Sequence, residues 1–300
     1  MCSGGQFFRI EEIAIRIGSP RAALVPPLTG ERVDSQNPTQ VRTGAIATRR
    51  GAAIVSVSAL VIVPTYNERG NLPTLISGLM KHDNVRVMVV DDQSPDGTGA
   101  LAERLAKEHP GRIEVMHRTG RRGLGRSYID GIRRALNEPV DVLCQMDADL
   151  SHDPAHLPDL IAATARADVV IGSRYIPGGD IVNWPKRRRL LSRFANIYIR
   201  AVTRLSARDC TSGYRCWRKS ALANLPLEQF ISDGYSFLVE MLFVASRRGC
   251  RIAEVPITFV ERRIGESKVS RAVLLESAIT PWRLIASPST ARKAPAGGAQ

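Results

Sequence analysis

The stretch Val85-Arg-Val-Met-Val-Val-Asp-Asp-Gln-Ser-Pro-Asp-Gly97 joins a β-branched apolar run to a pair of carboxylates and a turn. An apolar run of this length, bounded by turn residues, is typical of a buried strand. The same alternation of apolar run and helical spacing continues in both directions along the chain. Strands are predicted at 60–63, 85–90, 113–116, 140–146 and 169–171, and helices at about 71–81, 98–108, 124–136 and 155–166. This alternation indicates βαβ units, and therefore an α/β fold with a mostly parallel sheet flanked by helices.

Polar residues follow three of these strands. Pro64-Thr-Tyr-Asn-Glu68 comes after the first strand, Asp91-Asp92 begins the turn after the second, and Asp147-Ala-Asp-Leu-Ser-His-Asp153 follows the fourth. Each cluster alone is also ordinary turn chemistry, since Asp, Asn, Ser and Pro are common loop residues. Right-handed crossovers bring the carboxyl ends of parallel strands to one edge, where open α/β sheets bind ligands. Three clusters at one edge therefore predict a binding site there.

The Asp147-Ala148-Asp149 motif carries the most specific chemistry. Two carboxylates at this spacing, at the end of a buried strand, suit a hard divalent cation with oxygen ligands. Such a cation can hold a diphosphate and offset the charge that builds up on a departing phosphate. The alternative is a capped turn before the next helix, for which Asp153 would serve as well. His152 is expected to be a polar residue of the turn rather than a base.

Composition limits the classes of protein that the chain can represent. Its 300 residues are 44% hydrophobic and 24% charged, which is enough apolar material for a large folded core. Lys and Arg number 42 against 29 Asp and Glu, and the formal net charge of +13 predicts a polyanionic partner. Only 5% of residues are aromatic and no basic–aromatic alternation is present, so nucleic acid is not the expected partner. The five cysteines form no C-x-x-C pair, which argues against a disulfide framework or a zinc site.

The regular pattern predicts one domain over residues 58–285. Residues 1–57 are weakly patterned and contain several prolines, so we expect a flexible extension there, and we expect residues 286–300 to form a flexible tail. No apolar stretch reaches about 18 residues, the length that predicts a spanning helix. The first residues lack the charged start and apolar run of a signal peptide. These features predict a cytoplasmic protein that is soluble or peripheral on a membrane.

A basic segment lies between Arg174 and Arg218, with eleven basic and two acidic residues. Within it, Trp184-Pro-Lys-Arg-Arg-Arg189 precedes a helical pattern that runs to about residue 205. Apolar residues recur on one side of this pattern: Leu190, Phe194, Ile197, Ala201 and Leu205. A basic amphipathic helix after a tryptophan suits an anionic bilayer interface. The alternative is an ordinary surface helix whose apolar side packs on the core.

These motifs resemble those of a known family. The segments Val63–Glu68, Val90–Thr98, Arg118–Gly125, Asp147–Asp149 and Gly172–Tyr175 are similar to those of family 2 glycosyltransferases of the GT-A fold. The segments Thr211–Arg215, Gly234–Phe237 and Glu254–Lys268 resemble the dolichol-phosphate (polyprenol-phosphate) mannosyltransferases. The resemblance covers about residues 58–270. It implies a GT-A (Rossmann-like) fold and the inverting transfer of mannose from GDP-mannose to a polyprenyl monophosphate, with Mg²⁺ or Mn²⁺.

The resemblance also implies roles for particular residues. It assigns contacts with the nucleotide sugar to Pro64, Tyr66, Glu68, Asp92, Arg121, Asp147, Ala148, Asp149 and Glu240. It assigns the metal to Asp147, Asp149 and Ser151, although the family often has a longer glutamine at the position of Ser151. It assigns the acceptor phosphate and lipid to Arg174, Ser212, Arg262 and Lys268, and it makes Asp149, Arg262 and Lys268 catalytic. For Glu240, a structural ion pair with an arginine is the alternative.

The resemblance places an acceptor loop and an interface helix at residues 175–208, which implies a peripheral protein on the cytosolic face of a membrane. A membrane-anchoring partner protein is one arrangement that the family allows. Three other functions stay open: a sister enzyme that uses UDP-glucose or another sugar nucleotide, a non-catalytic nucleotide-binding or membrane scaffold, and a nucleic-acid-binding protein. The apolar repeat among the arginines argues against the last of these.

Overall fold

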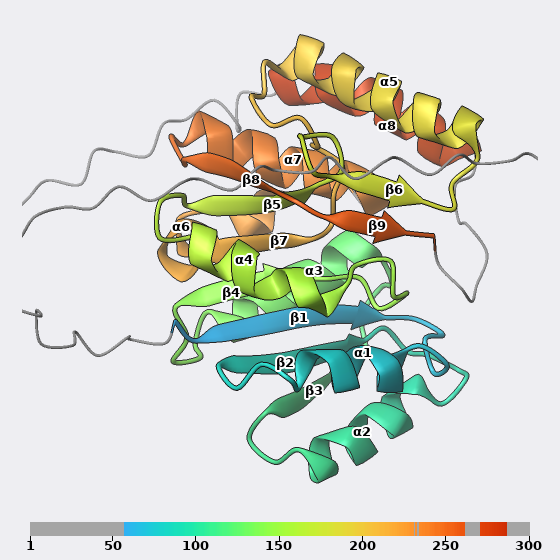
Figure 1. Cartoon of the computed structure of the whole chain (residues 1–300), viewed down its shortest axis with the longest axis vertical. Helices are drawn as coiled ribbons and strands as arrows, with labels where there is room; N and C mark the ends of the chain where they lie inside the picture. Colours follow the sequence, from blue (N-terminus) through green and yellow to red (C-terminus); the bar gives the residue numbers. More distant parts are fainter. Residues whose placement is uncertain (1–56, 231, 233, 262–270, 287–300) are drawn as a thin grey trace, which may run out of the picture. The chain divides into compact units, whose positions relative to one another are not determined.

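The computed structural model describes residues 57–230, 232, 234–261 and 271–286. Almost all of the predicted extension and tail therefore lies outside the described residues. A seven-stranded sheet forms the centre, in the order β3-β2-β1-β4-β7-β5-β8 (Figure 1). The strands are β1 Ala59–Thr65, β2 Val85–Asp91, β3 Ile113–His117, β4 Val142–Gln145, β5 Val169–Ser173, β7 Arg215–Arg218 and β8 Ile252–Pro256.

Strand direction confirms the predicted mostly parallel sheet. Strand β1 pairs in parallel with β2 and β4, β2 with β3, and β5 with β8. Only β7 runs antiparallel, between β4 and β5. The sequence predicted β1 to β5 at their observed places, although the predicted strand 140–146 is shorter, at Val142–Gln145. It did not predict β7 or β8.

Helices cover both faces of the sheet. They are α1 Leu72–Leu79, α2 Thr98–Glu108, α3 Leu124–Ala135, α4 Leu157–Ala163, α6 Lys219–Ala223 and α7 Gly234–Arg247. Short 3₁₀ turns lie at Pro154–His156 and Leu227–Gln229. The helix predicted over 155–166 is thus a 3₁₀ turn followed by α4, which has a proline in its first turn.

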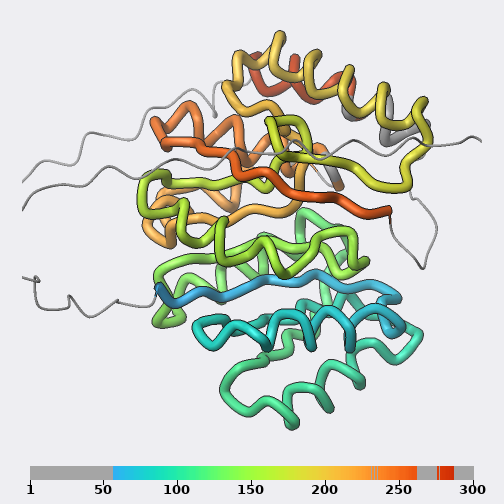
Figure 2. The backbone as a smooth tube through the Cα atoms, in the orientation of Figure 1, coloured from blue at the N-terminus to red at the C-terminus, as the bar shows by residue number. Residues whose placement is uncertain are grey.

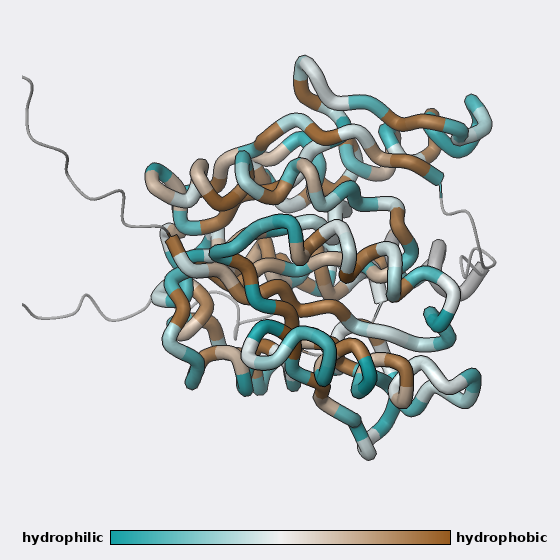
Figure 3. The backbone as a smooth tube through the Cα atoms, turned by 60° about the horizontal axis from the view of Figure 1, so that its bottom comes forward, coloured by the Kyte–Doolittle hydropathy of each residue, from teal (hydrophilic) through white to brown (hydrophobic). Residues whose placement is uncertain are grey.

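The two faces of the sheet bury different residues, because successive side chains of a strand point in opposite directions. Leu60 lies in a cluster with Ile132 of α3, whereas Val61 lies in a second cluster with Leu75 of α1 and Leu160 of α4. Figure 3 shows the hydrophobic residues running through the central strands. This double-sided burial explains why the strands read as nearly continuous apolar runs.

Gly131 brings α3 close to the sheet. A Cβ atom at this position would lie 2.8 Å from Cγ2 of Ile62 and 3.0 Å from Cγ2 of Val90. Any larger residue would therefore push α3 away from β1 and β2. The close approach fixes the depth of Tyr128, one turn earlier in α3.

A second layer extends beyond the far edge of the sheet. Strands β6 Asp180–Val182 and β9 Thr258–Val260 form a short parallel ribbon. Helices α5 Lys186–Thr203 and α8 Arg271–Ala286 lie side by side, and α8 also contacts α7 (Figures 1 and 2). The helix expected to run to about residue 205 ends at Thr203, because Arg204 adopts a left-handed φ of 60°.

Candidate active site

The loops at the carboxyl ends of β1, β2 and β4 each contain a non-glycine residue in the left-handed region. Asn67, Gln93 and Leu150 have φ values of 60°, 61° and 62°. Such residues are uncommon and persist where the surrounding structure holds them. Because the three strands are parallel, the three strained turns lie at one edge of the sheet. This edge is the one that the sequence predicted for the binding site.

Asp147, at the end of β4, has a hydrogen-bond donor on one side and an open space on another. The Tyr128 hydroxyl on α3 donates a hydrogen bond to Asp147 Oδ1 at 3.1 Å. On another side, a Cβ atom at Gly213 would lie 3.0 Å from Asp147 Oδ2. The glycine therefore leaves space beside this carboxylate that any other residue would fill. Burial, together with the Asp147 carboxylate, raises the pKa of Tyr128 well above its ordinary value, so Tyr128 stays a donor at neutral pH.

Asp149 is nearly buried and accepts two hydrogen bonds from Ser151. The backbone N–H of Ser151 lies 3.1 Å from Asp149 Oδ1, and its hydroxyl lies 2.5 Å from the same oxygen. The serine thus orients the carboxylate by donating its hydroxyl proton. Ala148, between the two aspartates, is buried in the core cluster around Val61. The loop therefore anchors its middle residue and presents a carboxylate on each side.

His152 is buried beneath this loop, a position that the sequence did not predict. Its Nδ1 accepts a hydrogen bond from the backbone N–H of Asp147 at 3.3 Å. Its ring stacks on Tyr214 at 5.1 Å between centroids and meets the edge of Phe259 at 5.6 Å. Burial lowers the pKa of His152, so the neutral ring with Nδ1 as acceptor is the favoured form. His152 supports the Asp147 backbone from below.

Asp92, after β2, connects the basic loop Arg118–Gly125 to the sheet. It forms a buried ion pair with Arg118 and accepts the backbone N–H of Gly123 at 2.8 Å. Arg118 also donates to Asp130 on α3 at 2.8 Å and to the carbonyl of Arg121 at 3.1 Å. Asp92 therefore lies at the predicted edge, with its charge balanced by a loop that folds over it.

Arg122, the residue after the predicted Arg121, contacts Tyr66 of the first loop. Its guanidinium lies 2.5 Å from the Tyr66 hydroxyl and 4.9 Å from the ring centroid. Both arginines are exposed, and the contact of Arg121 with the nucleotide sugar stays a prediction. Nearby, Glu68 accepts the Asn71 amide at 2.8 Å, and Pro64 is buried within β1.

Arg174 follows β5 and is buried. It forms a bidentate ion pair with Asp209, with both N–O distances 2.7 Å, and donates to the Thr211 hydroxyl at 2.8 Å. Burial alone would raise the pKa of Asp209, but the Arg174 charge and its hydrogen bonds hold it below the ordinary value. Arg174 is therefore fixed at the predicted acceptor side with its charge shared by a carboxylate.

The indole ring of Trp184 lies close to the Arg174–Asp209 pair. The Arg174 guanidinium carbon is 5.7 Å from the Trp184 ring centroid, and that of Arg188 is 4.1 Å away. Trp184 Nε1 is buried and has no hydrogen-bond partner within the described residues. A buried N–H without an acceptor is costly in a folded protein. Sequence reasoning marked Trp184 only as an interface residue, whereas the structure gives it a donor that a ligand oxygen would satisfy.

Ser212 lies in the loop beside Gly213, and Arg215 holds this loop in place. Arg215 is fully buried and donates to the carbonyls of Ser212, Cys210 and Leu238 at 2.9, 2.8 and 2.6 Å. Burial lowers its pKa to about 10, which leaves it charged at neutral pH. Arg215 therefore joins the loop to α7.

Glu240, also on α7, is buried and accepts the backbone N–H of Ser232 at 2.9 Å. This bond fixes the chain just before α7 begins. The contact between Glu240 and the sugar stays a prediction. Arg262 and Lys268, which the sequence assigned to the acceptor and to catalysis, lie outside the described residues.

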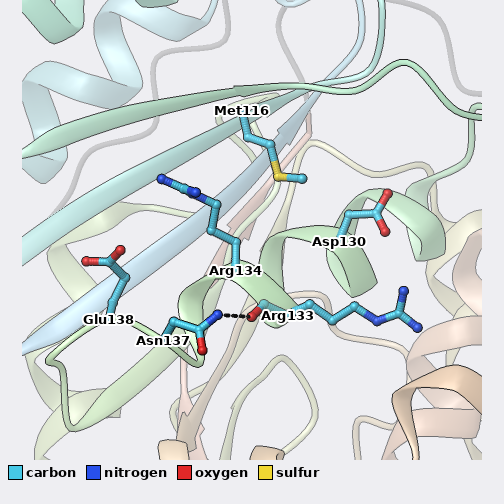
Figure 4. Close-up of a pocket in the computed structure, with 6 residues that line it drawn as sticks. All are labelled: Met116, Asp130, Arg133, Arg134, Asn137 and Glu138. Carbon is cyan, nitrogen blue, oxygen red and sulfur yellow. Dashed lines mark hydrogen bonds between the residues drawn. The ribbon is translucent and has the colours of Figure 1, made fainter.

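One surface hollow lies beside α3. It measures about 380 Å³ and is lined by Met116, Asp130, Arg133, Arg134, Asn137 and Glu138 (Figure 4). Its arginines already have partners, since Arg134 pairs with Glu114 and Arg133 with Glu228. None of the predicted site residues lines it.

Comparisons with known proteins agree with the geometry. Residues 60–225 match the profile of glycosyl transferase family 2. The chain is 48% identical over 221 residues to a polyprenol monophosphomannose synthase of Mycolicibacterium smegmatis, covering 73% of this chain and 83% of that protein. It is 47% identical over 232 residues to an undecaprenyl-phosphate mannosyltransferase of Micrococcus luteus, covering 76% of this chain and 94% of that protein.

Among solved structures, the chain is similar to glucosyl-3-phosphoglycerate synthase of Mycobacterium tuberculosis in complex with Mn²⁺, UDP-glucose and phosphoglyceric acid. The TM-score is 0.57 at 17% identity, covering 75% of this chain and 79% of that chain. At this identity the likeness concerns the fold alone. It confirms the GT-A fold that the sequence predicted.

Proposed function

The chain belongs to glycosyl transferase family 2, and on that premise we propose that it transfers mannose from GDP-mannose to a polyprenyl monophosphate. One observation carries the proposal: identity of 47–48% with two proteins named for this transfer, over most of their length. The loops at the carboxyl edge of the sheet supply the charged groups that such a reaction needs. The product would be a lipid-linked mannose for later glycosylation steps.

The residues present fit a divalent cation. Asp147 and Asp149 provide two hard carboxylate donors, and Gly213 leaves space beside Asp147 that a Cβ atom would fill. Asp147 and Asp149 would hold Mg²⁺ or Mn²⁺, with Ser151 orienting Asp149. When bound, the cation would offset the negative charge of the diphosphate leaving group. The solved relatives that contain Mn²⁺ with a nucleotide support this choice.

The chain's own groups orient the reactants. Tyr128 orients the Asp147 carboxylate and His152 holds its backbone, so the carboxylate does not need to reorganise during the reaction. A polyprenyl monophosphate is already an anion at neutral pH, so it needs no strong base to attack the anomeric carbon. Direct attack on the face opposite the leaving group inverts that carbon. No proton acceptor is therefore required among the residues at this edge.

On the acceptor side, cationic and neutral donors would hold the attacking phosphate. Arg174 lies over the Trp184 ring, and Ser212 precedes Gly213, which lies beside Asp147. Arg262 and Lys268 are proposed to join them. Because two phosphate groups must approach each other, most of the catalytic effect would come from charge compensation and alignment.

An apolar surface on α5 and α8 supports docking to a membrane. The large hydrophobic residues that are exposed in the described part of the chain all lie on these two helices: Leu190, Leu191, Phe194, Ile197, Ile279, Trp282 and Ile285. Leu190 is 70% exposed and Phe194 is 63% exposed. The opposite side of α5, with Asn196, Ile199 and Thr203, packs on the protein. Of the stripe that the sequence predicted, Leu190, Phe194 and Ile197 are thus exposed, whereas Leu205 is buried in the core.

We call the seven exposed residues the apolar α5/α8 surface. A contiguous exposed apolar patch is typical of an interaction site, and the arginines along α5 suit anionic headgroups. Across the described residues, no helix has the length and hydropathy needed to cross a bilayer. Peripheral attachment through this surface, at the cytosolic face, is the proposal that fits these facts.

Changing Phe194 and Ile197 to glutamate should abolish binding to vesicles. Both side chains are more than half exposed, so the fold should survive, while two charges would oppose insertion into the interface. The measurement is flotation of the full chain with phosphatidylglycerol-containing vesicles. The control is Ala100→Glu with Ala162→Glu, which adds the same charges at exposed positions on α2 and α4. Equal flotation of both variants would refute docking through this surface.

A transfer assay tests the proposed reaction and its alternatives. Radiolabelled GDP-mannose and UDP-glucose are each supplied with a polyprenyl phosphate, with and without Mg²⁺ or Mn²⁺. We expect metal-dependent label in the lipid fraction from GDP-mannose. Transfer from UDP-glucose instead would favour the sister enzyme, and no transfer from either donor would favour a scaffold.

A further inference from the structure

A pocket of about 260 Å³ opens where α5, α7 and α8 end together. It is lined by Val202, Thr203, Arg204, Phe243, Arg247, Leu284 and Ile285. Most of its lining residues are apolar, and the lining also includes two exposed arginines, Arg204 and Arg247. Most spaces between packed helices are filled by side chains. The three helix ends leave this one open, so a ligand can enter it from the surface.

In the part of the chain that the structure describes, the two arginines have no acidic partner. No acidic residue lines the pocket, and within the described residues neither Arg204 nor Arg247 takes part in an ion pair. Helix carboxyl ends attract cations, which explains why arginines stand here. The helix dipoles do not explain why the cavity is open. They also do not explain why Arg204 adopts a left-handed φ of 60°.

The pocket is continuous with the apolar α5/α8 surface. Ile285 belongs to both, and Trp282 lies one turn before it on α8. A ligand in this pocket would therefore have a phosphate-binding end beside the arginines and an apolar end along α8. Guanidinium groups bind phosphate in bidentate fashion, and hydrocarbon chains suit the exposed isoleucine and tryptophan.

We propose that this pocket binds the headgroup of an anionic phospholipid. Arg204 and Arg247 contact the phosphate, and the acyl chains follow the apolar α5/α8 surface into the bilayer. The pocket is separate from the candidate active site. Trp184, on the active-site side, contacts Arg188 at the amino end of α5, whereas the pocket lies at the carboxyl end. Arg188 and Arg204 are about 24 Å apart along the helix axis. Two phosphate sites at opposite ends of one helix would set how the protein lies on the membrane.

The test uses a soluble lipid, so that it does not depend on vesicle docking or on the transfer reaction. The full chain is titrated with short-chain phosphatidylglycerol below its micelle concentration, and binding is followed by calorimetry and native mass spectrometry. We expect one saturable equivalent. Arg204→Gln with Arg247→Gln should weaken binding about tenfold or more, because charge-assisted contacts to the phosphate are lost.

Matched controls separate this site from general attraction. Arg187→Gln with Arg193→Gln removes two charges from α5 outside the pocket and should leave the titration unchanged. Short-chain phosphatidylcholine and glycerol 3-phosphate should each bind about tenfold more weakly than phosphatidylglycerol, because one lacks net charge and the other lacks acyl chains. The pocket variant should keep its thermal midpoint and its transfer activity on a detergent-dispersed acceptor.

Three results would overturn the proposal. Unchanged binding in the pocket variant would do so, and so would an equal loss in the control variant, which would indicate diffuse electrostatic attraction. Binding that appears only when the chain is shortened to Ala286 would mean that its own last residues occupy the pocket instead.

Discussion

Asp149→Ala is expected to lower transfer by on the order of a thousandfold while the protein stays folded. Asp149 is one of the two carboxylates that would hold the metal and diphosphate, so its loss should act on the chemical step. Its carboxylate accepts the backbone N–H and the hydroxyl of Ser151, two residues later in the same loop, so thermal unfolding of the variant is measured beside its activity. The measurement is the rate of label transfer at saturating GDP-mannose and metal.

Asp153→Ala is the matched control for this variant. Asp153 lies four residues further along the same loop, and its carboxylate accepts the backbone N–H of Ala155 at 2.9 Å. We expect nearly normal transfer, with a small loss of stability from the missing helix cap. A wild-type rate in Asp149→Ala would overturn the metal assignment. An equal loss in both variants would mean that the loop conformation, rather than the Asp149 carboxylate, limits the rate.

Arg174→Met should destabilise the fold by about 3–5 kcal/mol, because it leaves the Asp209 carboxylate buried without its partner. Denaturant unfolding measures this change. The loss of transfer in this variant would be ambiguous, since an unstable protein is also inactive. The Arg174–Asp209 pair offers a way to separate the two effects.

The double variant Arg174→Met with Asp209→Asn removes both charges together. It should regain most of the lost stability, because no buried charge is left unpaired. If Arg174 also binds the acceptor phosphate, the double variant should still show a KM for polyprenyl phosphate raised about tenfold or more, with an unchanged KM for GDP-mannose. A normal acceptor KM in the stable double variant would make Arg174 purely structural.

Local sequence was enough to predict five of the seven strands of the sheet and the edge where their polar loops meet. The runs that became β1, β2 and β4 are mostly apolar, and polar residues follow them where the parallel strands end. Strand β7 was not predicted because it has only four residues, with an arginine at each end and Cys216 and Trp217 between them. Its burial depends on β4 and β5, which lie far away in the sequence.

Side-chain partnerships across long distances in the chain were not predictable. Arg174 pairs with Asp209, 35 residues later, and His152 stacks on Tyr214 and Phe259. No spacing rule connects such residues. The apolar stripe around α5 was equally consistent with packing on the core and with exposure, and the structure divides it, with Leu190, Phe194 and Ile197 exposed and Leu205 buried.

A crystal structure of the protein with GDP-mannose and Mn²⁺ tests the central claim most directly. The account predicts one ion at the carboxyl edge of the sheet, bound by Asp147 or Asp149 at about 2.1–2.2 Å and by the diphosphate on its other side. The mannose should then point toward Arg174 and Trp184. A donor bound elsewhere, with both aspartates far from any ion or phosphate, would contradict the account.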